Sequence, residues 1–361
     1  MRYIIFGASR IGRAFYKALS ETSKDAIAGF CDNDPQKQEE TVDGKSIRPI
    51  QAYHREDVCF LLAMQGHPMM DAYGTLRKER EDTWSVRAIT DWSMAPGRDL
   101  RAATQAINLR LPVLEYVETD IVTHCNLKCK NCGHLSDQLP PSFVDVAGYE
   151  RDVARLAELY SGCTRFRIMG GEPLLHPEIV RLAQAVRRHL PMANLRIVTN
   201  GLLIPKLSDE KLQGIHDAGA EFDITQYPPT AKILPDIEAR LEAFGIRYHV
   251  SALVDRFYAF EAQRPADPVE SYQHCMYPHC HSMQSGYIAV CGVGLFAKRM
   301  ADFLGRDISE EEVERNRIDL YDKSLTGERL SKMLRSPIPA CRYCGVEPPP
   351  LVPWESRRES V

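Results

Sequence analysis

The chain has 361 residues, which is long for one domain and predicts two or three. Hydrophobic residues make up 44% of it, enough for packed cores, and the formal net charge of -4 indicates neither a nucleic-acid partner nor a membrane surface. The longest apolar runs, such as 58–64, are too short to span a bilayer. Eleven cysteines and an N-terminus without a signal-peptide layout predict a cytoplasmic protein whose thiols bind metal rather than form disulfides.

The N-terminal segment begins with a strand, a glycine turn and a helix. Gly7-Ala-Ser-Arg-Ile-Gly12 separates an apolar run from a helical pattern, which is the layout of a nucleotide-binding βαβ unit. A second strand leads to Asp32, whose carboxylate is placed to accept a ribose hydroxyl. Ser9 stands where a middle glycine would admit a pyrophosphate, so tight packing of the helix on the strand is an equal explanation of Gly7 and Gly12.

The segments 29–35 and 42–50 resemble the small Rossmann-like domain of sugar-modifying enzymes from surface-glycan and natural-product pathways. The resemblance implies that residues 1–95 dock a nucleotide or nucleotide sugar, or serve only as a scaffold. A working NAD dehydrogenase is a third alternative, for which no catalytic Tyr-x3-Lys set is evident. A linker over 96–112, with a helix-like segment at 100–108, is expected to follow.

Three cysteines share one short loop after a strand-like run. Cys125, Cys129 and Cys132 stand at C-x3-C-x2-C spacing. Soft thiolates select iron–sulfur clusters, and three of them leave one iron of a [4Fe–4S] cube without a protein ligand. The open iron can chelate a small molecule, so the spacing indicates a reactive cluster. A zinc knuckle is the alternative.

A second motif, Gly170-Gly171-Glu172-Pro173, follows the apolar run 165–169. In this order the two motifs resemble the radical S-adenosylmethionine (radical SAM) superfamily. The resemblance implies that SAM binds the cluster, with its amino group held by Glu172 and the backbone of the motif. The chain differs at Asn131, where the family usually has an aromatic residue near the adenine.

Strand-like and helix-like runs alternate after residue 113, which predicts an α/β fold with a parallel sheet wrapped by helices. The resemblance implies a partial (β/α)6 barrel over 113–268, with its chemistry at the carboxyl ends of the strands. Asn200 and Thr225 lie at such ends and are expected to contact SAM, although turn chemistry and strand propensity explain them equally well. The expected strands are 113–122, 165–169, 195–199, 222–225 and 247–252, and the expected helices are 149–160, 177–189, 207–218 and 235–244.

Five further cysteines follow: Cys275, Cys280, Cys291, Cys341 and Cys344. Their spacing resembles the SPASM or twitch extension of radical SAM enzymes, which implies one auxiliary [4Fe–4S] cluster in a module over 269–347. Cys291, Cys341 and Cys344 are the expected ligands, and Cys275 or Cys280 supplies the fourth, with the spacing favouring Cys275. A structural zinc site is the alternative. Residues 348–361 are expected to be an extended tail.

The resemblance implies reductive cleavage of SAM to a 5′-deoxyadenosyl radical, with a flavodoxin or ferredoxin-like electron donor. An auxiliary cluster favours oxidation of the substrate, whereas a spare thiol, Cys275 or Cys280, favours epimerisation by returning a hydrogen atom. The domain combination resembles carbohydrate and aminocyclitol dehydrogenases and epimerases, so a sugar, cyclitol or nucleotide-sugar substrate is expected. A peptide-modifying maturase and a non-catalytic iron–sulfur scaffold are the alternatives.

Overall fold

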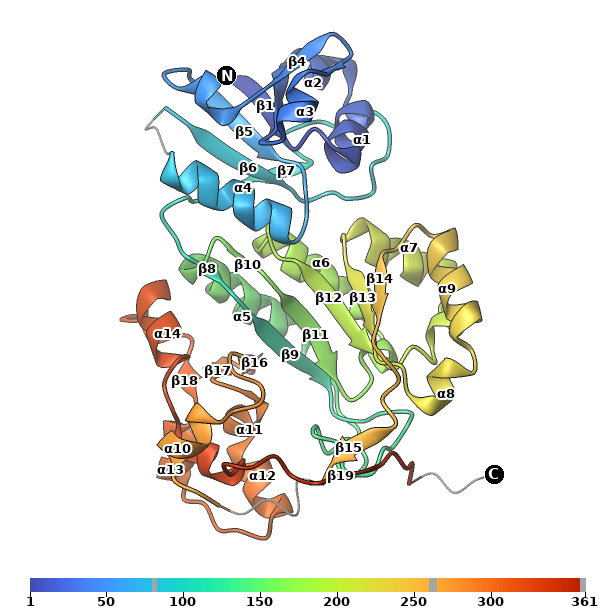
Figure 1. Ribbon diagram of the computed structural model, residues 1–361, viewed down its shortest axis with the longest axis vertical. Helices are drawn as coiled ribbons and strands as arrows, with labels where there is room; N and C mark the ends of the chain where they lie inside the picture. Colours follow the sequence, from blue (N-terminus) through green and yellow to red (C-terminus); the bar gives the residue numbers. More distant parts are fainter. Residues whose placement is uncertain (80–82, 260–264, 358–361) are drawn as a thin grey trace.

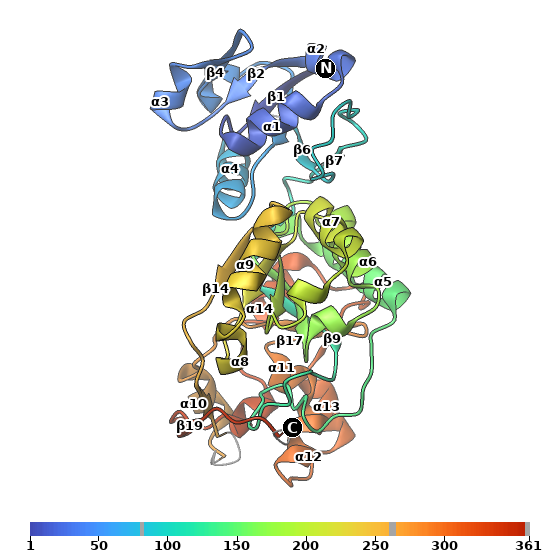
Figure 2. The same ribbon diagram turned by 90° about the vertical axis from the view of Figure 1, so that its right-hand side faces the viewer.

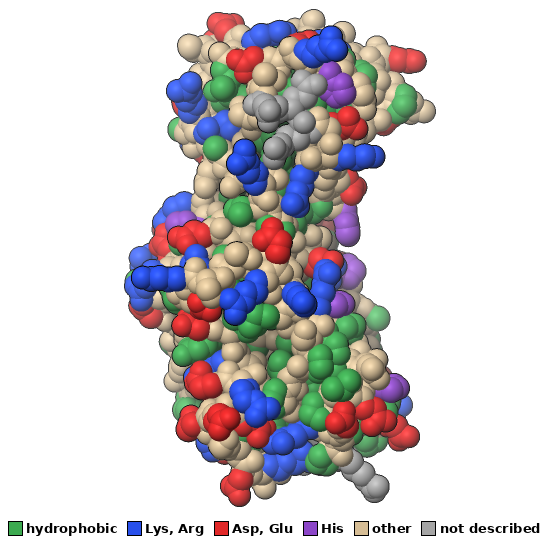
Figure 3. Space-filling model, turned by 90° about the vertical axis from the view of Figure 1, so that its left-hand side faces the viewer, with side chains coloured by type: hydrophobic (Ala, Val, Ile, Leu, Met, Phe, Trp, Pro, Cys, Tyr) green, Lys and Arg blue, Asp and Glu red, His purple; other side chains and the backbone are tan. Residues whose placement is uncertain are grey.

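The computed structural model describes residues 1–79, 83–259 and 265–357. An N-terminal domain, a central curved sheet and a C-terminal module follow one another along the long axis (Figure 1). The N-terminal domain forms a separate upper lobe, and hydrophobic side chains gather on the lower part of the face in Figure 3. Within these ranges, no helix has the length and apolar character needed to cross a membrane.

The N-terminal domain is built on a seven-stranded sheet in the order β3-β4-β2-β1-β5-β6-β7. All of β5 is buried, as is typical of a central strand in a parallel sheet. The edge strand β7 pairs antiparallel with β6, so the sheet extends into the segment expected as a linker. The helix expected at 100–108 is replaced there by turns and by β7, because pairing with the sheet edge overrides the local apolar spacing. The elements are β1 (Arg2–Phe6), α1 (Arg10–Ala18), α2 (Glu21–Asp25), β2 (Ile27–Cys31), α3 (Pro35–Gln38), β3 (Thr41–Val42), β4 (Lys45–Arg48), η1 (Ile50–Tyr53), β5 (Val58–Leu62), α4 (His67–Lys78), β6 (Ser85–Ile89) and β7 (Thr104–Ala106).

The central sheet has eight strands in the order β14-β13-β12-β11-β9-β16-β17-β18 and remains open, with β14 and β18 at its edges. Five parallel strands come from the predicted barrel region, and the sixth, β16, comes from the C-terminal module. The expected strand 113–122 is divided into β8, which pairs with β10, and β9. The elements are β8 (Val113–Leu114), β9 (Val117–Val122), α5 (Val146–Leu159), β10 (Gly162–Cys163), β11 (Phe166–Gly170), η2 (Pro173–Leu175), α6 (Ile179–His189), β12 (Leu195–Thr199), η3 (Ile204–Lys206), α7 (Asp209–Asp217), β13 (Glu221–Ile224), α8 (Pro228–Ala231), α9 (Leu234–Ala243) and β14 (Tyr248–Val250).

A layer of charged side chains lies on the central sheet near the amino ends of its strands. The Asp223 carboxylate accepts hydrogen bonds from Arg167 at 2.8 Å and from Arg196 at 2.6 Å. Met169 and Thr225 lie two residues further along the same strands and therefore on the same face. These charged side chains therefore lie toward the amino ends of the strands, and the carboxyl ends beyond them are available to bind ligands.

The N-terminal domain docks on the amino ends of the barrel strands (Figures 1 and 2). The Trp92 backbone N–H donates to the carbonyl of Asp217, shortly before β13, at 3.3 Å. The Tyr73 hydroxyl donates to Ser161, shortly before β10, at 3.0 Å. The cluster loop follows the opposite, carboxyl end of β9, so the two predicted ligand sites lie at opposite ends of the barrel.

The C-terminal module continues the sheet through the hairpin β16–β17 and returns toward the cluster loop. The predicted tail forms a strand, β19, which pairs antiparallel with β15. Its elements are β15 (Arg256–Tyr258), α10 (Pro268–Gln273), β16 (Ser282–Gln284), β17 (Tyr287–Ala289), α11 (Gly292–Leu295), α12 (Ala297–Phe303), α13 (Glu310–Arg315), β18 (Ile318–Asp319), α14 (Gly327–Met333), η5 (Pro339–Tyr343) and β19 (Leu351–Pro353). Residues 358–361 of the predicted tail lie outside the described residues.

Candidate functional site

The three cysteines of the first motif, Cys125, Cys129 and Cys132, line one cavity of about 140 Å³. It lies at the carboxyl ends of β9, β11, β12 and β13. All three are free thiols. The loop coils tightly, since Lys128 and Asn131 adopt positive φ angles of 51° and 59°. Four other residues predicted to bind SAM line the same cavity: Gly170, Gly171, Asn200 and Thr225.

The two glycines of the second motif allow the end of β11 to approach the start of the cluster loop. A Cβ on Gly170 would lie 2.4 Å from the carbonyl oxygen of Val122, and one on Gly171 would lie 2.0 Å from that of His124. The Gly171 N–H donates to the Val122 carbonyl at 2.7 Å. Any side chain at either position would push the two sides of the cavity apart.

The Glu172 carboxylate is fully buried and positions the next strand end. It accepts hydrogen bonds from the N–H of Leu174 at 3.0 Å, the hydroxyl of Thr199 at 2.7 Å and the N–H of Asn200 at 2.9 Å. Burial raises the pKa of Glu172 to about 7, against the opposing effect of these three donors. These contacts fix the Glu172 side chain at the strand end, and its expected contact with the SAM amino group stays a prediction. Pro173 is likewise buried, in η2.

Asn200 joins the loop after β12 to the cluster loop. Its Nδ2 donates to Asn126 Oδ1 at 2.7 Å and lies 3.6 Å from Cys125 Sγ. Burial raises the pKa of Cys125 to about 11 and that of Cys129 to about 12. These thiols therefore carry protons without metal, and iron binding has to displace the protons.

Three thiols around one cavity fit the soft donor set of an open [4Fe–4S] cluster. Within the described ranges, no three His, Cys, Asp or Glu side chains close around the position of a single metal ion.

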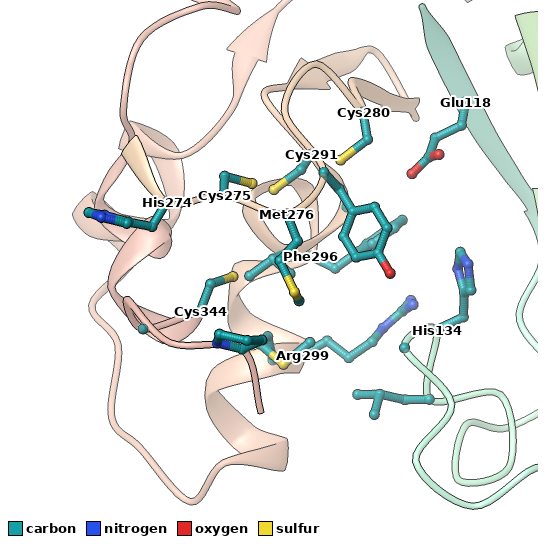
Figure 4. A pocket seen from close by; sticks show the side chains of 18 of the residues that line it. Glu118, His134, His274, Cys275, Met276, Cys280, Cys291, Phe296, Arg299 and Cys344 are labelled. Atoms are coloured by element: carbon teal, nitrogen blue, oxygen red, sulfur yellow. The ribbon is translucent and has the colours of Figure 1, made fainter. Parts of the chain in front are cut away.

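Four of the five C-terminal cysteines, Cys275, Cys280, Cys291 and Cys344, line a second cavity, of about 220 Å³; Cys341 is not among its lining residues. The sulfur atoms of Cys275, Cys291 and Cys344 point toward one another, and the Cys280 sulfur, between Cys291 and Glu118, also points toward Cys291 (Figure 4). Cys341 belongs to η5, three residues before Cys344. A hydrogen bond between Cys280 and Cys291 raises the pKa of Cys280 and lowers that of Cys291.

Three charged side chains that the sequence analysis did not select form the opposite wall of this second cavity together with His134. They are Glu118, Asp120 and Arg299. Glu118 accepts from the Tyr116 hydroxyl at 2.6 Å and from the Ser282 hydroxyl at 2.8 Å, and burial raises its pKa. Glu118 and Asp120 are two residues apart on a largely apolar strand and so face the same side, which was the available sequence signal.

His134 connects the two cavities, because it lines both of them. Its Nδ1 lies 3.1 Å from Asp120 Oδ2, and the attraction of Asp120 raises the pKa of His134 to about 10. An imidazolium next to the cluster loop is thus part of the wall of both the three-cysteine cavity and the second cavity.

The predicted nucleotide-binding residues lie at the other end of the molecule. The Asp32 carboxylate accepts a hydrogen bond from the Ala8 N–H of the glycine turn at 2.8 Å. A Cβ on Gly12 would lie 1.8 Å from the carbonyl oxygen of Gly7. The turn uses its acid and its glycines for internal packing.

Comparison with known proteins finds a family similarity in the central part of the chain. Residues 120–246 match the sequence model of the radical SAM superfamily. The GTP 3′,8-cyclase of Chlorobaculum tepidum is 32% identical over 110 residues, which cover 30% of this chain and 31% of that protein. The GTP 3′,8-cyclase of Clostridium acetobutylicum is 25% identical over 144 residues, 36% of this chain and 44% of that protein. The chain thus spans less than half the length of these curated relatives.

Among solved structures, BtrN in an open conformation is 18% identical with a TM-score of 0.35, covering 64% of this chain and 92% of that one. Streptococcus suis SuiB bound to the precursor peptide SuiA is 17% identical with a TM-score of 0.33, covering 42% and 35%. The family to which residues 120–246 are similar implies a [4Fe–4S] cluster and SAM, and the three-cysteine cavity fits both. Residues 120–246 of this chain are therefore similar to the radical SAM superfamily.

Proposed function

We propose that the protein is a radical SAM enzyme that removes a hydrogen atom from a sugar, cyclitol or similar polyhydroxylated substrate bound in the cavity between its two cysteine sets. When bound, the cluster and SAM supply the 5′-deoxyadenosyl radical. The charged wall of this cavity, formed by Glu118, Asp120 and Arg299, supports a polar substrate.

The position of Cys280 is the observation that favours one reaction, epimerisation, over the other. Cys275, Cys291, Cys341 and Cys344 are proposed as the auxiliary-cluster ligands, which leaves Cys280 as a protonated thiol beside Glu118 (Figure 4). The Cys280 S–H bond breaks as a C–H bond forms at the substrate radical, on the face opposite to the original hydrogen. One electron from a flavodoxin or ferredoxin-like donor and one proton then restore the thiol. Epimerisation is the proposed outcome.

Oxidation to a ketone is the second candidate, supported by the auxiliary cysteine set as an electron acceptor. The N-terminal domain is proposed as a Rossmann-like scaffold, because Asp32 is hydrogen-bonded to Ala8 and the domain docks at the amino ends of the strands. A nucleotide bound there could not present its sugar to the cluster loop at the opposite end.

The test is turnover in heavy water by anaerobically reconstituted protein, with sugars, cyclitols, aminoglycosides, nucleotide sugars, GTP and candidate peptides as separate arms. The proposal predicts that a carbohydrate arm stimulates 5′-deoxyadenosine release and yields an epimer carrying one deuterium. Cys280→Ala should still release 5′-deoxyadenosine but return no deuterated epimer, while the matched control Cys59→Ala, in the N-terminal core, behaves as wild type. A product lighter by two hydrogens would indicate oxidation, and stimulation only by a peptide or by GTP would refute the substrate class.

A further inference from the structure

The C-terminal segment 351–357 lies across the cluster loop. Beyond the β15–β19 pairing, the Trp354 N–H donates to the Asp255 carbonyl at 2.7 Å. The segment then forms two backbone hydrogen bonds with the loop, from Lys130 N–H to the Glu355 carbonyl and from Arg357 N–H to the Lys128 carbonyl, each 2.8 Å long. These bonds hold the loop on both sides of Cys129.

Side chains strengthen this contact. The Ser356 hydroxyl donates to the Leu127 carbonyl at 2.6 Å. Arg357 Nε lies 2.7 Å from the Asp137 carboxylate, whose side chain is only 1% exposed. A buried carboxylate that loses its cation is costly, so this ion pair favours the closed position of the segment more than an exposed pair would.

Trp354 reaches the cluster loop directly. Its indole Nε1 lies 3.1 Å from Cys129 Sγ and donates to it. Its ring stacks against Tyr227 at a centroid distance of 6.4 Å, and Tyr227 stacks against Phe257 at 5.8 Å. Tyr227 and Phe257 line the cavity of the three cysteines, so the indole is held in place by the walls of that cavity.

We propose that segment 351–357 is a clamp on the cluster loop and that Trp354 is a positioning residue that donates a hydrogen bond to the Cys129 thiolate. The proposal rests on the proposed cluster at Cys125, Cys129 and Cys132. A donor to a ligand sulfur stabilises the more negative, reduced cluster, and hydrogen bonds to sulfur are among the factors that set cluster potentials. The clamp thereby eases reduction of the cluster and holds its ligand loop closed.

The first test is Trp354→Phe in the reconstituted holoenzyme, which keeps an aromatic ring and removes the N–H. A redox titration followed by electron paramagnetic resonance should give a more negative midpoint potential for the SAM-binding cluster, with the auxiliary signal unchanged. The matched control is Trp84→Phe, whose indole donates to the Tyr53 carbonyl in the N-terminal domain and should leave both potentials as in wild type. An unchanged potential in Trp354→Phe overturns the hydrogen-bond assignment.

The second test is a chain that ends at Pro350. Hydrogen exchange of the backbone at Lys128 and Lys130 should become faster, and a chelator should extract the iron of the SAM-binding cluster more quickly than from wild type. Equal exchange and equal iron release would overturn the clamp. Exchange is also measured on metal-free protein, so the clamp is tested even if wild type binds no iron at these cysteines, a result that would instead refute the proposed function.

Discussion

The Glu172 carboxylate lies 2.9 Å from the backbone nitrogen of Asn200, and this contact connects the two halves of the SAM cavity. Glu172 follows β11 and Asn200 follows β12, so one buried acid fixes the relative position of two strand ends. Asn200 in turn reaches Asn126 on the cluster loop at 2.7 Å. The motif acid therefore acts on the cluster loop through Asn200.

The buried Glu172 makes stability depend on pH. Its pKa is about 7 in the folded protein and 4.5 for the ordinary group, so the folded state holds the proton more tightly. Stability should therefore fall as the pH rises from about 4.5 to 7, by up to about 3 kcal/mol at 1.36 kcal/mol per pKa unit. Urea unfolding of metal-free wild type and Glu172→Gln at several pH values between 5.5 and 8 isolates this effect.

In Glu172→Gln the pH-dependent loss should be smaller than in wild type, because the variant does not titrate. The variant should also be less stable at the acidic end by about 1–3 kcal/mol, since its amide NH₂ cannot accept from all three donors. Identical pH profiles for the two proteins would contradict the assigned burial of a titrating carboxyl.

The second cysteine set is tested by iron content. Cys341→Ala combined with Cys344→Ala should remove roughly half of the bound iron, because two four-iron clusters contribute equally. The control pair Cys31→Ala and Cys59→Ala changes two buried thiols of the N-terminal core and should leave the iron per folded chain unchanged. Unchanged iron in the Cys341 and Cys344 double variant would rule out the auxiliary cluster.

Two glycine substitutions test the internal packing on which the proposed scaffold role of the N-terminal domain depends. Gly12→Ala places a Cβ 1.8 Å from the Gly7 carbonyl and should destabilise the domain by several kcal/mol, because a backbone atom cannot give way as a side chain does. Gly74→Ala, in α4 with nothing within 4 Å of the added carbon, should stabilise it by about 0.5–1 kcal/mol. Thermal unfolding gives both values, and a Gly12→Ala protein as stable as wild type would contradict the packing.

The barrel strands could be predicted because their apolar runs are local. The expected strands at 165–169 and 195–199 correspond to Phe166–Gly170 and Leu195–Thr199. The helix expected at 100–108 was wrong because pairing of Thr104–Ala106 with the sheet edge depends on residues far from it in sequence. The pairing of Arg256–Tyr258 with Leu351–Pro353 spans more than ninety residues and leaves no local pattern.

The candidate site, too, could be predicted only where its features depend on local sequence. Cysteine spacing located Cys125, Cys129 and Cys132, since residues on one short loop are close together in any fold. The second set spans Cys275 to Cys344 and was expected only from a family resemblance. The contact between Trp354 and Cys129, and the charged wall with Asp120 and His134, join segments distant in sequence. The protein donors to Glu172 could not be predicted either, because only the fold shows which groups surround it.

The most direct test of the central claim is 5′-deoxyadenosine release from SAM by anaerobically reconstituted protein with a reductant. Wild type should release it, and the triple variant Cys125→Ala, Cys129→Ala, Cys132→Ala should release none while keeping the auxiliary iron. Continued release by the triple variant would contradict the assignment of these three cysteines, and with it the proposed active site.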